Sequence, residues 1–335
     1  MRASRWAYAL GYFVIVALLV ACVAPPSGTG GAAVPYVAAP NAAAARRTLR
    51  PHSWMKLAVN QELLYVSNAN GIVNVYRYWQ RDLVGELTDF TQPEGECADA
   101  KGDVYITDYS TGDIDEYAHG GKTALRVIDE SGYNPYACAI DPKTGDLAVA
   151  NYGKGGYYTQ GSLAIYAHAK GNPTYYSSKD LYHMNGVAYD NYGDLLATGF
   201  YLYSDEYLET YFAYVPAKSK DFQEISLPPP DSSGWYETEV SGLGWDGEYW
   251  TVDLYDAVYQ YSINIKPELV GSVKLDAAEI PVAFYNPNPK KQATQAVSGS
   301  GNDVYYWKYP AGGEPYVTLT HGLDKPFGIA ISGRK

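Results

Sequence analysis

The sequence predicts an all-β fold, a six-bladed β-propeller with four-stranded blades. Three observations predict it: the composition, a repeated segment, and the division of the last repeat between the two ends of the domain. Tyrosine occurs 35 times in 335 residues, beside 33 Gly and 20 Pro. Tyrosine is enriched in strands, whereas Gly and Pro favour turns. We therefore expect many short strands joined by turns.

The repeat first occurs at Pro93-Glu-Gly-Glu-Cys-Ala-Asp99, followed by the strand-like runs VYITD and DIDEYAHGG. Later copies begin at Pro135, Met184, Ser241, Pro281 and Pro326. Neighbouring starts lie 40 to 57 residues apart, and each unit holds about four short strands. That period is typical of propeller blades.

The last copy stops at the C-terminus after a single strand, Pro326-Phe-Gly-Ile-Ala-Ile. Its missing strands are predicted at the other end of the domain, at 63–68, 71–78 and 83–89. A four-stranded blade cannot bury both of its faces alone, so blades must stack around an axis. We expect the N-terminal strands to join the C-terminal strand and close the circle.

The first 21 residues have the pattern of a secretory signal peptide. Arg2 and Arg5 form a short basic region, and residues 6–21 carry no charge. That stretch is short for a membrane-spanning helix, which needs about 20 residues. It ends in Leu19-Val-Ala-Cys22, which resembles the lipobox of bacterial lipoproteins, and the resemblance implies that Cys22 carries lipid. A plain signal peptide and an uncleaved anchor are the alternatives.

Residues 22–52 are rich in Ala, Pro and Gly and predict a flexible tether, with the propeller at 53–335. A lipid-anchored protein of the cell envelope is therefore expected, on the periplasmic or extracellular side. Because no acidic residue directly follows Cys22, the lipoprotein resemblance indicates the outer membrane where the cell has one. The net charge of −12 argues against a nucleic-acid partner, since it repels phosphate backbones. A monomer is expected.

Two short patterns are similar to known propeller repeats. Tyr65-Val-Ser-Asn68 resembles the YVTN repeat of surface-exposed bacterial propellers. The pattern P-x-G-x-x-x-D followed by G-D-x-Y-x-x-D resembles NHL-type propellers and the gluconolactonase-like ones. The resemblance covers residues 60–335, and its motifs specify architecture, not chemistry.

Two cysteines remain after Cys22. Cys97 and Cys138 lie on the innermost strands of consecutive blades, at positions of opposite parity, so their side chains leave opposite faces of their strands. Neighbouring blades pack unlike faces together, and an exported protein meets an oxidising environment. The sequence therefore predicts a Cys97–Cys138 disulfide. The alternative is a pair of buried free thiols.

A set of residues recurs at the end of the second strand of each blade and is expected to ring one end of the central channel. Its members are Asn68, Asp108, Asn151, Gly199, Asp253 and Gly299. In gluconolactonase-like relatives a Glu, an Asn and an Asp there hold a divalent cation, usually Ca²⁺. The ring positions predict a polar channel end that binds a metal or another ligand, with the binding set Asn68, Asp108, Asn151 and Asp253 near Glu94, Glu96 and Asn185. The alternative is that strand-ending Asp and Asn bond their own turns.

Tyrosine clusters are expected in or beside the longer connections between strands, at 133–136, 152–161, 201–207 and 234–239. Insertions in repeat proteins map to loops that often bind ligands, although tyrosine as a general filler explains the clusters equally well. His119 and His168 are expected at exposed repeat positions. No HExxH, GxSxG or Gly-rich phosphate loop is present in the sequence.

The predicted function is a membrane-tethered binding or interaction module for a protein or glycan, with no catalytic residue or cofactor assigned. The alternative is a Ca²⁺-dependent lactonase, hydrolase or lyase at the polar end of the channel.

Overall fold

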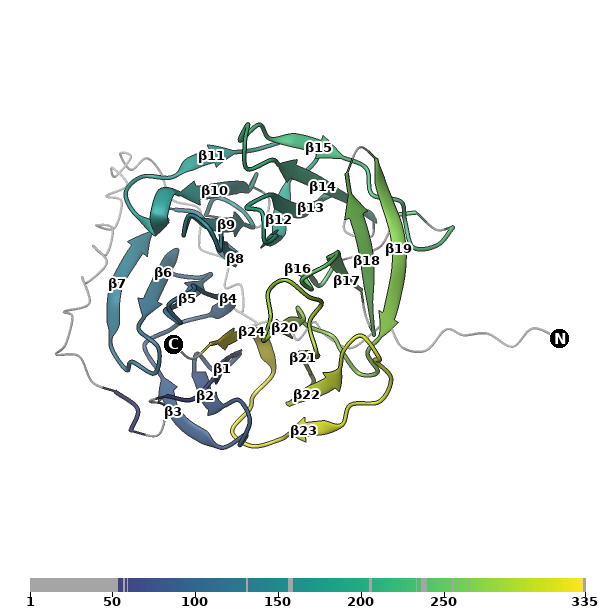
Figure 1. The fold of residues 1–335 in the computed structure, drawn as a ribbon. Coiled ribbons are helices and arrows are strands. Elements are labelled where there is room, and N and C mark those ends of the chain that lie inside the picture. Colours follow the sequence, from purple (N-terminus) through teal and green to yellow (C-terminus); the bar gives the residue numbers. More distant parts are fainter. Residues whose placement is uncertain are drawn as a thin grey trace, which may run out of the picture. The chain divides into compact units, whose positions relative to one another are not determined.

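The computed structural model describes residues 54–333 except 57, 59, 131, 156–158, 205–206, 233, 236–239, 255 and 265. These residues form six four-stranded antiparallel sheets around a central axis (Figure 1). The predicted six-bladed β-propeller is confirmed. The expected signal peptide, Cys22 and the tether at 22–52 lie outside the described residues. Within the described part of the chain, no helix has the length and apolar character needed to cross a membrane.

The strands of each blade are named from the innermost outwards. The first blade contains β24 (Pro326–Ser332), β1 (Leu63–Asn68), β2 (Val73–Arg77) and β3 (Leu83–Leu87). The second contains β4 (Pro93–Ala98), β5 (Val104–Asp108), β6 (Asp113–Tyr117) and β7 (Ala124–Asp129). The third contains β8 (Pro135–Ile140), β9 (Leu147–Asn151), β10 (Ser162–Tyr166) and β11 (Thr174–Tyr176), with a 3₁₀ turn at Ala167–Ala169.

The fourth blade contains β12 (His183–Tyr189), β13 (Leu195–Ser204), β14 (Tyr207–Val215) and β15 (Gln223–Ile225). The fifth contains β16 (Gly242–Trp245), β17 (Trp250–Leu254), β18 (Ala257–Ile263) and β19 (Pro267–Lys274). The sixth contains β20 (Ala283–Tyr285), β21 (Gln295–Ser300), β22 (Asp303–Lys308) and β23 (Val317–Leu319). We call the face where the innermost strands begin the strand-start face, and the opposite one the strand-end face.

The circle closes in the first blade, as predicted. Strand β24 pairs antiparallel with β1, so strands from both ends of the domain share one sheet. His119 of the second blade adds a link, since its Nδ1 lies 2.6 Å from Ser332 Oγ and its Nε2 2.8 Å from the Gln61 carbonyl oxygen. His168 is exposed as expected, but His119 is half-buried because it bridges this closure.

The core is divided into six hydrophobic clusters, one between each pair of neighbouring blades. Strand β1 shows why its sequence is apolar throughout. Leu63 and Tyr65 pack toward the second blade, whereas Leu64 and Val66 pack toward the sixth. Successive side chains of a strand point to opposite faces, and in β1 both faces are covered.

Most of the innermost strands are followed directly by an Asp whose side chain stabilises the turn that comes next. Asp99 Oδ1 accepts hydrogen bonds from the backbone N–H groups of Lys101, at 2.7 Å, and Asp103, at 2.9 Å. Asp190 repeats the pattern with Tyr192 and Asp194. In such an Asx turn, the Asp side chain accepts a hydrogen bond from the backbone N–H two residues later and takes the place of a main-chain carbonyl acceptor. This accounts for the recurring D-x-x-G-D pattern on the strand-end face.

Candidate functional site

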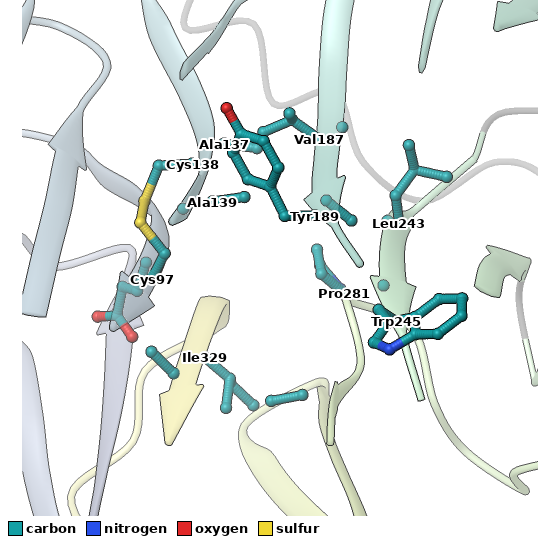
Figure 2. Close-up of a pocket in the computed structure, with 18 of the residues that line it drawn as sticks. Cys97, Ala137, Cys138, Ala139, Val187, Tyr189, Leu243, Trp245, Pro281 and Ile329 are labelled. Carbon is teal, nitrogen blue, oxygen red and sulfur yellow. A yellow bond between two sulfur atoms is a disulfide. The ribbon is translucent and has the colours of Figure 1, made fainter. Parts of the chain in front are cut away.

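A cavity of about 370 Å³ lies on the axis and is lined by all six innermost strands (Figure 2). Its lining begins at the level of Gly95, Ala137 and Gly328 and extends past the strand ends to the turn residues Pro142 and Asn191. The cavity therefore opens at the strand-end face.

Glycines narrow the channel toward the strand-start face. A methyl group on Gly95 would lie 2.5 Å from the carbonyl oxygen of Tyr136 and 2.6 Å from the Cα of Ala137. One on Gly328 would overlap the carbonyl oxygen of Glu94. The innermost strands of three blades thus touch backbone to backbone, which only glycine permits at these positions. This is the physical role of the Gly in the repeated P-x-G unit.

Most of the side chains that line the cavity are apolar, but polar atoms make up about half of its accessible surface. Tyr189, Trp245 and Phe284 contribute the large side chains nearer the open end. Glu96 is the one acidic residue in the lining among the described residues. Its Oε1 accepts a 2.7 Å hydrogen bond from Ser67 Oγ, and burial raises its pKa to about 8. At neutral pH the cavity wall is therefore largely uncharged.

The predicted disulfide is confirmed, and it lies in the cavity wall (Figure 2). Cys97 of β4 and Cys138 of β8 have Cα atoms 5.7 Å apart. The bond joins the innermost strands of the second and third blades, as the opposite parity of the two positions predicts.

The four residues of the predicted binding set do not line this cavity, and each is buried. Asn68 donates to the carbonyl oxygens of Val66 and Ile72, and its Oδ1 accepts from the backbone N–H of Asp324. The bonds with Ile72 and Asp324 join the end of β1 to neighbouring loops, whereas the bond with Val66 lies within β1.

Asp108, Asn151 and Asp253 do the same in other blades. Asp108 accepts from the backbone N–H groups of Thr91, at 2.7 Å, and Gln92, at 3.1 Å, which lead into β4. Asp253 accepts from the backbone N–H of Val282, at 2.8 Å. Burial raises the pKa of Asp253 to about 7. These contacts are mostly with neighbouring loops, not with the residues' own turns, and a ligand-binding role for these residues stays a prediction.

Asn151 belongs to a buried polar network. It donates to Glu130 Oε2, at 3.1 Å, and Glu130 also accepts from the hydroxyl groups of Tyr166 and Tyr175. The two glycines of the ring, Gly199 and Gly299, lie within β13 and β21.

The Ca²⁺ site implied by the gluconolactonase-like resemblance stays a prediction, and residues named near it make other contacts. Across the described residues, no group of three or more His, Cys, Asp or Glu side chains is placed to hold a metal ion. Glu94 bonds to Gln92 Nε2, at 2.8 Å, and burial raises its pKa to about 7. Asn185 donates instead to the carbonyl oxygen of Val240 in the neighbouring blade. We therefore derive no reaction step from a bound cation.

Aromatic side chains join the second, third and fourth blades on the strand-start face. We call this group the aromatic cluster: Tyr109, Tyr136, Tyr152, Tyr182, His183, Phe200 and Tyr201. Their rings contact one another in series, with centroids 4.4 to 6.4 Å apart. All the tyrosines in it are partly exposed, whereas the two other rings are buried.

The aromatic cluster gathers residues from three of the four predicted tyrosine segments. One of these segments, 201–207, covers the end of β13, which extends to Ser204, and the start of β14 at Tyr207. This hairpin continues the pairing of the fourth blade beyond the usual strand length.

Sequence reasoning missed one element of the strand-end face. Residues 286–294 connect β20 to β21, whereas only residues 99–103 connect β4 to β5. The unusual length of Asn-Pro-Asn-Pro-Lys-Lys-Gln at 286–292 was the available signal.

The sequence matches no family model and no curated protein. Solved structures share its fold. A chain of the nidogen/laminin complex has a TM-score of 0.59 at 13% identity, over 81% of this chain and 98% of that one. A protein of unknown function from Bacteroides caccae has a TM-score of 0.56 at 12% identity, over 81% and 99%. Kuenenia stuttgartiensis hydrazine synthase has 0.53 at 12%, over 75% and 76%. Identities this low show the propeller fold alone.

Proposed function

We propose that the protein is a binding module of the cell envelope, held by a lipid on Cys22, which contacts a protein or glycan through the aromatic cluster. The observation that carries the proposal is the continuity of this cluster across three blades. Loops that insert into a repeat architecture commonly form its binding edge.

The composition of the aromatic cluster supports an interaction surface. Tyr182 and Tyr201 pack edge to face with centroids 5.6 Å apart, and both are partly exposed. Tyrosine combines a large apolar ring with a hydroxyl group and is enriched at the cores of protein interfaces. His183 is buried; it stacks on Tyr152 and meets the edge of Tyr182, and the buried Phe200 packs against His183 and Tyr152, so the partly exposed rings rest on a packed base. Such a rigid aromatic surface loses little side-chain entropy on binding.

Three features of the sequence and one of the structure support the location. The lipobox-like Leu19-Val-Ala-Cys22 follows an apolar segment, and residues 22–52 have the composition of a tether. Tyr65-Val-Ser-Asn68 is similar to the YVTN repeat of surface-exposed bacterial propellers. The Cys97–Cys138 disulfide suits an oxidising compartment, because disulfides are rare in a reducing cytosol.

The test uses the full-length protein in its membrane, with Tyr182→Ala and Tyr201→Ala combined in one variant. Partners are captured by cross-linking to envelope extracts, and binding to purified envelope glycans is measured in parallel. We expect about a tenfold loss of the captured partner, since hot-spot truncations cost more than about 1 kcal/mol each. The control is Tyr316→Ala, which changes an exposed tyrosine of the sixth blade. Equal capture by the double variant and the wild type would contradict the proposal.

A further inference from the structure

The mouth of the central cavity is bordered by the loop at 286–294, which we call the β20–β21 loop. Asn191 of the fourth blade donates a hydrogen bond to the carbonyl oxygen of Pro289 in this loop. The loop therefore starts in the sixth blade, passes the fifth and reaches the fourth. In Figure 1 it runs from β20 toward β16.

A buried carboxylate fixes the loop to the fifth blade. Asp246 is fully buried, and its Oδ2 accepts hydrogen bonds from Gln292 Nε2, at 2.9 Å, and from the hydroxyl of Tyr309, at 2.8 Å. The backbone N–H of Ala293 donates to the Asp246 carbonyl oxygen. A methyl group on Gly247 would overlap the carbonyl oxygen of Lys291, so the short turn of the fifth blade leaves room for the loop. These contacts fix the position of the β20–β21 loop on the fifth blade.

The loop brings positive charge to the mouth of the cavity. Lys290 and Lys291 are exposed, and in the described part of the chain neither forms an ion pair. Both line a surface hollow together with Trp245 and the exposed Glu248, and Trp245 also lines the central cavity. Two lysines and one glutamate therefore lie beside the entrance to the cavity, which gives this hollow an excess of positive charge in a protein whose net charge is −12.

The interior of the cavity suits an uncharged group with an aromatic or aliphatic part, since most of the lining side chains are apolar and about half of the accessible surface is polar. Tyr189, Trp245 and Phe284 contribute aromatic side chains to the cavity lining, and Ala137 and Val187 contribute small aliphatic ones. The volume of about 370 Å³ lies at the lower end of the range for small-molecule sites, about 300–1,000 Å³. Pockets of this kind bind through apolar contacts, and a few polar groups set orientation.

We propose that the central cavity binds a small amphipathic anion, with its apolar body in the cavity and its anionic group beside Lys290 and Lys291. This site lies on the strand-end face, away from the aromatic cluster, so it adds a second ligand to the proposed function. An acid group at the mouth gains Coulomb energy from both ammonium groups, while the apolar body leaves water.

The probe is 8-anilinonaphthalene-1-sulfonate, an aromatic anion whose fluorescence rises in apolar surroundings, titrated into the folded full-length protein. We expect saturable binding with one probe per protein. Octanoate should displace it at least tenfold better than octylamine, which has the same chain length and the opposite charge. Failure to bind, or equal displacement by the two compounds, would overturn the proposal.

Two variants assign the binding to this site. Lys290→Gln combined with Lys291→Gln should weaken octanoate binding about fivefold or more, because the charge at the mouth is removed. Lys101→Gln, an exposed lysine on the same face in the second blade, is the matched control and should bind as the wild type does. Ala139→Leu should reduce the affinity for octanoate and octylamine alike by filling the cavity. Unchanged octanoate affinity in the double lysine variant would overturn the placement of the anionic group beside the two lysines. The separate proposal that the aromatic cluster binds a partner would not be affected by that result.

Discussion

At the level of single residues, short carboxylate and amide side chains hold turns and loops through hydrogen bonds to the backbone. On the strand-end face, Asp99 and Asp190 bond the backbone of their own turns, and on the strand-start face Asp108 does so for the loop that leads into β4. The same short side chains would also suit a cation. Which role they take depends on the groups that surround them, and in this protein these groups are backbone N–H donors.

Glu96 carries a testable consequence for pH dependence. Burial raises its pKa to about 8, above the ordinary glutamate value, so the folded protein holds this proton more tightly than the unfolded chain does. The resulting stabilisation is present below about pH 4.5 and is lost as pH rises through about 8. Glu96→Gln removes the titratable proton and keeps an acceptor for Ser67.

We expect Glu96→Gln to lose less unfolding free energy than the wild type between about pH 5 and pH 9. Urea unfolding at several pH values measures this difference. Glu94 and Asp253 also have raised pKa values, so the variant should retain part of the decline. Glu86→Gln, an exposed glutamate of β3, is the control and should follow the wild type. A Glu96→Gln curve parallel to the wild type would refute the prediction.

The apolar or polar character of each strand follows from how many of its faces are covered by neighbouring blades. Strand β1 is buried on both faces and is apolar throughout, whereas β7 in the outermost position of its blade is only partly buried. The β13–β14 hairpin and the β20–β21 loop depart from the repeat, one by longer pairing and the other by a longer connection. Both departures lie at the candidate binding surfaces, which is expected where a repeat architecture carries function.

Strand β24 offers a matched pair of substitutions. Ile329 is 7% exposed and packs in the cluster between the first and sixth blades, whereas Phe327 on the same strand is 37% exposed. Ile329→Asp places an unpaired charge in that interface and should destabilise the domain by about 3 kcal/mol or more. Phe327→Asp should change stability by less than about 1 kcal/mol.

Chemical unfolding and size-exclusion chromatography of the two variants measure the difference. Because β24 closes the circle, the Ile329→Asp protein should also expose the apolar edge of β1 and aggregate. Similar stability of the two variants would show that the closure does not depend on this interface.

At the level of the whole molecule, the ring creates two distinct faces from one repeat. The strand-start face is narrowed by glycines and carries the aromatic cluster, while the strand-end face opens the cavity beside a lysine-bearing loop. The disulfide holds two innermost strands together at the wall between them. A lipid on Cys22 would leave both faces available, because the predicted tether separates the propeller from the membrane.

The lipid anchor is tested with Cys22→Ala in a bacterial host. We expect the wild type to incorporate labelled fatty acid and to fractionate with membranes, because the acylated cysteine inserts in the bilayer. The variant should lose the label and leave the membrane fraction. Cys97→Ala, which removes a different cysteine, is the control for labelling. Acylation that persists in Cys22→Ala would contradict the predicted anchor.

The architecture could be predicted from the amino-acid sequence alone. Repeat starts from Pro93 to Pro326 predicted the blades, and the lone C-terminal strand predicted the closure with β1. The Cys97–Cys138 pair followed from strand parity. These features depend on local alternation and on the order of units along the chain, which a sequence displays directly.

The places where ligands can meet this protein became visible only in three dimensions. The cavity arises from the way six innermost strands surround an axis, and the contact from Asn191 to Pro289 crosses an entire blade. The aromatic cluster joins loops from three blades, and Asp108 is turned inward to bond a loop. Such contacts depend on the rotation and spacing of blades, and these follow from how side chains pack between neighbouring sheets, which no single repeat specifies.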